Sequence, residues 1–232
     1  MKAEGKPQSF CYHIVRKRVK NINLHITQDG EVWVSAPRNV SAKTIDAFVN
    51  QKADWIAKAR SKITQHAGLS FFDGSKVLLF GEYVPVIATA GSVTRAELKN
   101  GSLAVTLPDP EDAESVAKVV DDWLYTYSGE VFERLGESVF AMFASLYKPK
   151  PQLRARRMKA RWGSCHPQKG LILLSHRLVC APPECIQYVL AHEFAHLVHP
   201  NHSPAFYSLL SDVMPDHKSR RALLSQYSGV MR

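Results

Sequence analysis

The chain has 232 residues, of which 45% are hydrophobic, and its 30 Lys and Arg against 21 Asp and Glu give a formal net charge of +9. This composition excludes a globally disordered chain, and no apolar run reaches the roughly 18 residues of a membrane-spanning helix. The N-terminus lacks the apolar core of a secretory signal, and the four cysteines form no CxxC pair, so we expect a reduced, cytoplasmic protein.

The first third of the chain is expected to contain strands followed by a helix. Strands are predicted between residues 10 and 35, and Gln28-Asp29-Gly30 is the predicted turn of a hairpin, because Asp-Gly supplies the positive φ angles of a tight turn. Ser41 can cap the helix that follows. Apolar residues at helical spacing predict that this helix continues to about Thr64.

The middle of the chain is expected to contain a small sheet and a long helix. Short β segments between residues 76 and 107 predict a small antiparallel sheet. The segment Asp109–Asp112 favours a helix start, because it combines a cap, a proline in the first turn and acids at the positive end of the helix dipole. This helix is predicted to run to about Leu146 and to be bent or weakened at Gly129 and Gly136.

The last third is expected to contain two strands and then helices. The strands are predicted at Leu153–Trp162 and Leu171–Leu178, joined by a loop that contains glycine. From Pro182 onward the pattern indicates helices, and Ser203 is predicted to cap one of them. The sequence shows no internal repeat, so the order of elements predicts an α+β protein.

Positive charge is concentrated in one stretch of the sequence. No Asp or Glu occurs between Glu137 and Glu184, and residues 148–177 within this interval carry all of its basic side chains. Such a field attracts anions, for example nucleotides, nucleic acid or acidic peptides, although a solvated basic face is an equally simple interpretation. The basic residues are Lys148, Lys150, Arg154, Arg156, Arg157, Lys159, Arg161, Lys169 and Arg177.

The sequence HEFAH at residues 192–196 is an HExxH motif within a predicted amphipathic helix. A spacing of four residues places His192 and His196 on one helix face, one turn apart, where both imidazoles can bind the same Zn²⁺. Glu193 flanks that face and can take a proton from a zinc-bound water, whose pKa the metal lowers. The motif therefore predicts a catalytic zinc site with Glu193 as its acid/base.

A catalytic zinc usually has three protein ligands, and the third is open between several residues. His202 is favoured, because the Pro200-Asn201 turn can fold the chain back toward the first two histidines. His199 is less favoured, since a residue before proline is pushed out of helical geometry. A carboxylate from Glu184 or Glu130 is a further alternative, as used by some zinc hydrolases.

Three segments resemble the YgjP-like metallopeptidase family, whose relatives include the SprT and WLM zinc proteins. The first begins with VSAPRNVSAK at residue 34, the second is RMKARWGSC at Arg157–Cys165, and the third is YVLAHEFAHLVHPNHSPAF at Tyr188–Phe206. Together they extend the resemblance over about residues 12 to 225. The HExxH-x5-H element and the RWGS element are its most specific parts.

This resemblance implies a zincin-like C-terminal catalytic region with His192, His196 and His202 as metal ligands and Glu193 as the catalytic acid/base. We accordingly expect a flexible tail at residues 1–9, an N-terminal lobe of short antiparallel strands and helices at 10–108, and a zinc hydrolase region at 109–232. The two lobes are expected to form one family domain. The resemblance implies a hydrolase, by name a peptidase, and some family members look like nucleoside triphosphate pyrophosphohydrolases.

Arg161 belongs to the RWGS element and, by analogy with zincins, lies at the border of the active-site cleft. A guanidinium there can bind a phosphate or carboxylate with two parallel hydrogen bonds, and a structural ion pair is the alternative role. Tyr188 or Tyr207 is a further candidate for stabilising a developing anion. We therefore expect Arg161 to bind an anionic peptide or nucleotide substrate.

Two classes of function remain open from the sequence. The first is a zinc-dependent hydrolase of the metallopeptidase type, with nucleoside triphosphate hydrolysis on the same site as its alternative. The second is a nucleic-acid-associated module with a structural zinc and no turnover, which the presence of Glu193 disfavours. Imidazole ligands also accept Mn, Ni or Co as divalent ions, and no membrane partner is expected.

Overall fold

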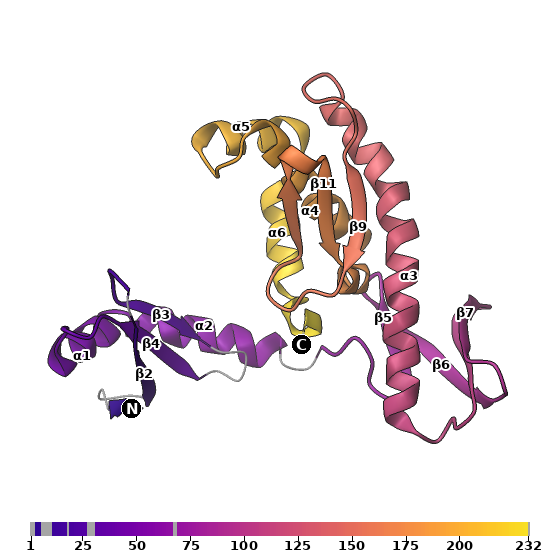
Figure 1. The fold of residues 1–232 in the computed structure, drawn as a ribbon, viewed down its shortest axis with the longest axis horizontal. Helices are drawn as coiled ribbons and strands as arrows, with labels where there is room; N and C mark the ends of the chain where they lie inside the picture. Colours follow the sequence, from indigo (N-terminus) through magenta and orange to yellow (C-terminus); the bar gives the residue numbers. More distant parts are fainter. Residues whose placement is uncertain (1–2, 6–10, 18, 27–30, 67–68, 232) are drawn as a thin grey trace. The chain divides into compact units, whose positions relative to one another are not determined.

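The computed structural model describes residues 3–5, 11–17, 19–26, 31–66 and 69–231 (Figure 1). The chain divides into two compact units, Met1–Gly68 and Leu69–Arg232. The boundary expected between residues 108 and 109 thus falls inside the second unit, which contains both the small sheet and the HExxH helix. The described residues form a mixed α+β protein with short sheets, and none of their helices is long and apolar enough to cross a membrane.

The first unit is a four-stranded sheet with two helices. The strand order is β1-β2-β4-β3, in which β3 and β4 are antiparallel, as the predicted hairpin requires, and its turn at 28–30 lies outside the described residues. Strands β2 and β4 pair in parallel. The elements are β1 Ala3–Gly5, β2 Tyr12–Arg16, β3 Asn23–Ile26, β4 Val32–Ala36, α1 Ala42–Gln51 and α2 Ala53–His66.

The helical region of this unit differs from the prediction in one respect. Ser41 does cap α1, because its hydroxyl accepts a hydrogen bond from the backbone N–H of Thr44. The single predicted helix is wrong, however, since α1 and α2 are separated at Lys52, whose N–H bonds back to Val49. No proline or glycine marks this break. Ile56 is buried in the same core as Val49, so the apolar spacing continues across the break.

The second unit begins with a sheet of order β5-β6-β8-β7. The predicted antiparallel arrangement is wrong for its central pair, because β6 and β8 are parallel. The chain passes from β6 to the outer strand β7 and returns through a tight turn at Asn100-Gly101, where both φ angles are positive. The strands are β5 Lys76–Leu79, β6 Glu82–Ala90, β7 Arg95–Lys99 and β8 Ser102–Leu107.

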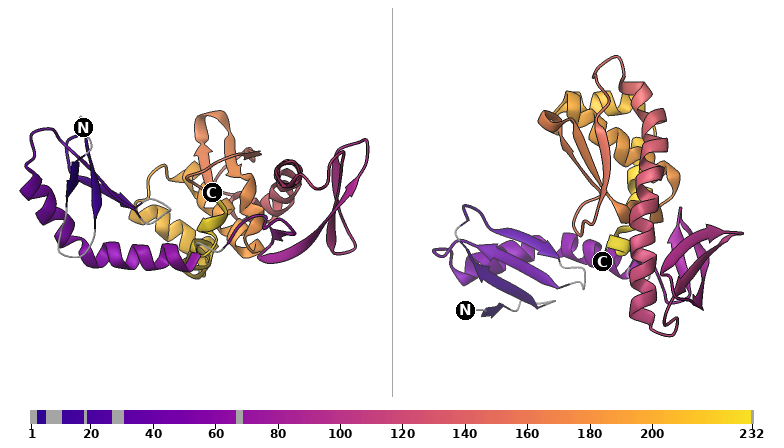
Figure 2. Two further views of the ribbon diagram at one scale, coloured as in Figure 1. Left: turned by 90° about the horizontal axis from the view of Figure 1, so that it is seen from below. Right: turned by 45° about the vertical axis from the view of Figure 1, so that its right-hand side comes forward.

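The long helix α3 spans Ala113–Phe140 and continues as a 3-10 turn, η1 Ala141–Phe143. Its cap is Asp112, the last residue of the predicted start segment, whose carboxylate accepts from the N–H of Glu114. The predicted weakening at its glycines is not seen, because α3 is one continuous element. Figure 2 shows α3 between the β5–β8 sheet and the sheet described next, and it contacts strands of both.

The second sheet has the order β10-β11-β9, with β9 parallel and β10 antiparallel to β11. Two predicted strands are in fact three, because the first predicted strand ends early and a new one begins at Gly163. The second predicted strand also ends at Ser175, where the 3-10 segment η3 His176–Cys180 begins. The strands are β9 Gln152–Arg156, β10 Gly163–His166 and β11 Leu171–Ser175, and η2 Pro167–Lys169 lies between the last two.

The C-terminal part is helical, as predicted. The helices are α4 Pro183–Val198, α5 Pro204–Val213 and α6 His217–Ser225, followed by the 3-10 segment η4 Ser228–Met231. Ser203 caps α5, accepting from the N–H of Phe206, as expected. Helix α4 packs against α3, β10, α5 and α6, so the HExxH segment lies at the centre of the second unit. Its apolar face, including Leu190 and Phe194, is fully buried.

Candidate metal centre and adjoining pocket

Three histidine side chains converge at the C-terminal end of α4. His192 and His196 lie one turn apart on the same helix face, with ring centroids 4.9 Å apart. Helix α4 ends at Val198, the backbone of the following His199 is extended, and the chain turns back through Pro200. This turn brings His202 to the pair, so that its Nε2 lies 3.0 Å from Nε2 of His192.

The three imidazoles form one candidate metal-binding group. Their ligand atoms all lie within 4.8 Å of one another. Phe206, fully buried in the first turn of α5, contacts all three rings, at centroid distances of 5.1, 4.7 and 4.8 Å for His192, His196 and His202. The structure does not bring the side chains of His199, Glu184 or Glu130 into this group.

The surroundings keep the imidazoles in the form that a metal requires. Burial, with the neighbouring imidazoles and Arg221, lowers the pKa of His192 to about 3, and burial also lowers the pKa of His196. Nδ1 of His196 lies 3.2 Å from the carbonyl oxygen of His199, an arrangement in which Nδ1–H donates and the Nε2 lone pair is free. Both side chains are therefore neutral ligands at neutral pH.

This donor set fits a divalent transition-metal ion. Two nitrogens at tetrahedral positions on a zinc ion, each about 2.05 Å from it, are roughly 3.3 Å apart. The observed Nε2–Nε2 distance of 3.0 Å between His192 and His202 is close to that value. Nδ1 of His192 is buried and has no hydrogen-bond partner in the structure. Three nitrogens leave a coordination position for water or substrate, as in catalytic rather than structural zinc sites.

Glu193 is buried next to the histidines, with 6% of its surface exposed. Burial raises the pKa of Glu193 to about 7, although the charge of Arg161 and a hydrogen bond from the Cys165 N–H oppose the shift. Strand β10 lies against this carboxyl group at Gly163, where an added Cβ would be only 2.6 Å from Oε1 of Glu193. A glycine at this position therefore lets the strand cover the glutamate.

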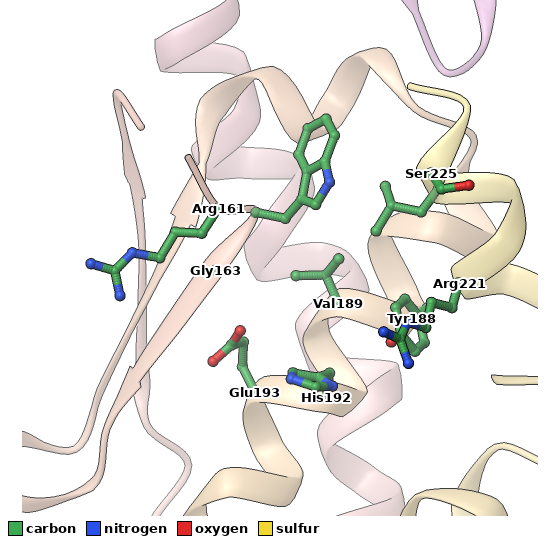
Figure 3. A pocket seen from close by; sticks show the side chains of 10 residues that line it. Arg161, Gly163, Tyr188, Val189, His192, Glu193, Arg221 and Ser225 are labelled. Carbon is green, nitrogen blue, oxygen red and sulfur yellow. The ribbon is translucent and has the colours of Figure 1, made fainter. Parts of the chain in front are cut away.

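A pocket of about 370 Å³ opens over Glu193 and His192 (Figure 3). Arg161 lies on its sheet side, whereas Tyr188 and Arg221 lie together on the opposite side. Trp162 and Leu224 contribute apolar surface to its wall. The pocket thus combines a buried carboxyl group, an imidazole of the histidine cluster and two arginines.

Part of the basic stretch is paired with acids of helix α3. Lys150 pairs with Glu133 and Glu137, Arg157 pairs with Asp121 and Asp122, and Arg177 pairs with Asp121. These acids precede the stretch in sequence, so the charge pattern of the stretch alone does not show these pairs. Arg161 lines the pocket and forms no salt bridge within the described part of the chain, and Figure 3 shows its guanidinium directed away from His192.

Three residues at this site were missed by the sequence analysis. Arg221 lies on α6, well beyond the motif, and no local pattern marks it. Phe206 and Gly163 lie in segments that carry the family resemblance, but neither was given a role at the site. Of the two tyrosine candidates, Tyr188 lines the pocket, whereas Tyr207 stacks on His202 at a centroid distance of 6.1 Å.

The family comparison agrees with this chemistry. The family described as YgjP-like, metallopeptidase domain, matches residues 20–227. The chain belongs to this family. Membership supports a metal-dependent hydrolase and implies a divalent metal, typically zinc. The search of curated proteins gives no match. Among solved structures, the chain is similar to the metallopeptidase zymogen abylysin of Pyrococcus abyssi, with 25% identity over 40% of this chain and 90% of that chain, and a TM-score of 0.37.

Proposed function

We propose that the chain is a metal-dependent hydrolase of peptide bonds, with His192, His196 and His202 as ligands of a zinc ion and Glu193 as the acid/base. The observation that carries the proposal is the convergence of three imidazoles beside a buried carboxyl group at the floor of a pocket. Mn, Ni or Co in the divalent state suits the same nitrogen ligands.

The number of ligands supports an enzyme over a structural zinc module. A structural zinc site is closed by four protein ligands. Within the described residues, no fourth His, Cys, Asp or Glu joins the cluster. Glu193 faces the pocket next to the cluster and is not a member of it. A glutamate buried at this position has an evident use in proton transfer and none in closing a structural site.

Glu193 and its neighbours supply the acid–base chemistry. A divalent metal on the histidines would acidify water and polarise the bond to be cleaved. Glu193 takes the proton from the attacking water and passes it to the leaving nitrogen, acting first as a general base and then as a general acid. The hydrogen bond from the Cys165 N–H keeps the carboxyl group oriented toward the pocket. Arg161 binds a charged or carbonyl oxygen of the substrate.

The sheet next to the site suits a peptide substrate. β10 is an edge strand, so its outer side can pair with an extended chain, apart from the Cys165 N–H, which donates to Glu193. It begins at Gly163, directly beside Glu193, so a peptide paired with β10 passes over the acid/base. An edge strand beside an HExxH helix is a zincin-like arrangement, which we infer for the second unit.

The decisive experiment compares wild type with Glu193→Gln, both loaded with zinc, on a mixed peptide library analysed by mass spectrometry. We expect wild type to cleave peptides and the variant to be slower by about 10²- to 10⁴-fold at equal zinc content, because only the proton acceptor is removed. Glu184→Gln, the same substitution in the first turn of α4, is the matched control and keeps full activity.

A parallel assay of pyrophosphate release from nucleoside triphosphates tests the second candidate, which the unpaired Arg161 favours as a phosphate ligand. Glu193-dependent release without peptide cleavage would replace the peptidase by a nucleotide hydrolase. Absence of both reactions, together with salt-dependent nucleic-acid binding, would instead identify a structural zinc module.

A further inference from the structure

The pocket extends past the histidine cluster to a second cationic side chain. Tyr188 lies on α4 one turn before His192, with the ring centroids 6.0 Å apart. Arg221 comes from α6, and in the view of Figure 3 it overlaps Tyr188 on the side of His192 opposite Arg161; its charge is close enough to act on the Tyr188 phenol. Both side chains line the pocket that contains Glu193.

Two adjacent arginines of α6 have different surroundings. Arg220 is engaged on both sides: it forms a salt bridge of 2.8 Å to Asp216 at the start of its own helix, and its hydrogen bond of 2.7 Å to Gln187 ties α6 to α4. Arg221 forms no salt bridge among the described residues and lines the pocket instead. Arg220 therefore holds the helix in place, whereas the N–H groups of the Arg221 guanidinium can bind a ligand in the pocket.

The charge of Arg221 acts on the groups of the site. Burial raises the pKa of the Tyr188 phenol, and Arg221 opposes that shift. Arg221 also contributes to the lowered pKa of His192. Tyr188 is only 7% exposed, and Val189 and Leu224 add apolar surface around it. A charged hydrogen bond is stronger in such surroundings than in water.

We propose that Tyr188 and Arg221 form an anion-binding subsite of the pocket, which accepts a carboxylate or phosphate group of the substrate near the bond to be cleaved. The guanidinium can give two parallel hydrogen bonds to such a group, and the phenol can give a third. The subsite's role in catalysis rests on the proposed function. It makes the preferred substrate anionic on the α6 side, separately from any contact that Arg161 makes.

The test is calorimetric binding of small probes to the zinc-loaded full-length chain. The probes are N-acetylphenylalanine, its neutral amide and inorganic pyrophosphate. We expect wild type to bind the acid about 10- to 100-fold more tightly than the amide, as for a hydrogen bond to a charged group. Arg221→Gln loses this preference. Lys218→Gln removes one positive charge from an exposed position of α6, and this variant should retain the preference for the acid. Tyr188→Phe reduces the preference by a smaller factor, because only one donor is removed.

The probes also identify the source of the anion. Arg221-dependent binding of pyrophosphate, but not of the acid, assigns the subsite to phosphate, and the reverse assigns it to carboxylate. Equal preference in wild type and Arg221→Gln, or no preference in wild type, overturns the proposal. Because binding is measured without turnover, an Arg221-dependent preference in a chain that cleaves no peptide would refute the proposed function and leave the subsite standing.

Discussion

The second unit contains two clusters of ionisable side chains in which the carboxyl pKa is shifted in opposite directions. In the first, burial alone would raise the pKa of Asp121, but hydrogen bonds and charges from His176, Arg157 and Arg177 hold it well below its usual range. His176 lies 2.9 Å and Arg177 3.1 Å from Asp121. The second cluster contains Glu193, where burial wins and the pKa rises to about 7.

The opposite pKa shifts suggest different roles, with the Asp121 cluster contributing to stability and the Glu193 cluster to the chemistry of the site. The Asp121 carboxylate is paired with His176 and Arg177 of η3 and with Arg157, the residue after β9, so its ionised form favours the folded state. Glu193 and His192 are buried with fewer partners than their polar atoms can use, and this disfavours their charged forms. Buried polar groups with unfilled hydrogen-bonding positions are typical of functional sites, where a bound ligand provides the missing partners. Substitutions in the Asp121 cluster should therefore lower stability and spare zinc affinity, whereas substitutions at the histidine site should lower zinc affinity or activity and spare stability.

The largest expected effect is on metal affinity. His202→Ala removes one of three ligands and should weaken zinc binding by about 10²-fold, because tetrahedral sites bind zinc with roughly 3 kcal/mol per ligand. Competition with a chromogenic chelator measures this loss. The melting temperature of the metal-free chain should barely change, since His202 is exposed.

His199→Ala is the control for that experiment, and it also decides between the two histidines that the sequence left open. Its side chain lies outside the cluster, and its carbonyl, which accepts from His196, is kept. Zinc affinity should stay within a few-fold of wild type. Loss of zinc affinity in His199→Ala, with none in His202→Ala, would make His199 the third ligand in place of His202.

A substitution in the other cluster should change stability and spare chemistry. Asp121→Asn leaves His176 and two arginines facing a neutral amide and should lower the free energy of unfolding by about 2 kcal/mol. Urea unfolding monitored by tryptophan fluorescence measures the loss. Zinc affinity of the folded protein should equal that of wild type, and a weaker affinity would mean that the clusters are coupled.

The acid dependence of this effect has a definite sign. The folded-state pKa of Asp121 lies below its ordinary value of 3.8, so its contribution is present above about pH 4 and is lost as pH falls toward the folded-state value. The stability difference between wild type and Asp121→Asn should therefore be full at pH 5 and smaller at pH 3. A difference that grows on acidification would contradict this assignment.

Gly163 connects the strand β10 to the acid/base, and its substitution should affect activity more than stability. In Gly163→Ala the new methyl group would lie 2.6 Å from Oε1 of Glu193, so the carboxyl group or the strand must move. We expect kcat to fall by about 10-fold, because small displacements of catalytic groups carry large penalties. Ser164→Ala, one residue along the same strand, is the control and should retain full activity.

Local patterns were sufficient for much of the site. The four-residue spacing of the HExxH motif and the Ser-Pro cap at residue 203 each depend on neighbours in sequence. They therefore placed α4 and α5, and the turn between these helices carries His202 to the pair. The roles of these residues as ligands stay predictions until metal is measured.

Features that depend on distant segments were not predictable. Alternating apolar residues indicate a strand but not the direction of its partner, so the parallel pairing of β6 with β8 was missed. The pairing of Arg157 with Asp121 joins residues 36 positions apart, and the basic stretch consequently looked unbalanced. Arg221 reaches the pocket only because α6 packs on α4, which no periodicity in α6 itself encodes.

The smallest expected effect contrasts two glycines of α3. At Gly129 an added Cβ would meet nothing within 4 Å, whereas at Gly136 it would lie 2.3 Å from Cδ1 of the buried Leu153. Gly129→Ala should therefore raise stability by about 0.5–1 kcal/mol, the helix-propensity gain of alanine. Gly136→Ala should lower stability by about 1 kcal/mol, because overpacking exceeds the same gain. Neither should alter zinc affinity. Thermal unfolding of both variants measures the pair, and equal shifts would mean that the close packing of α3 on β9 does not require Gly136.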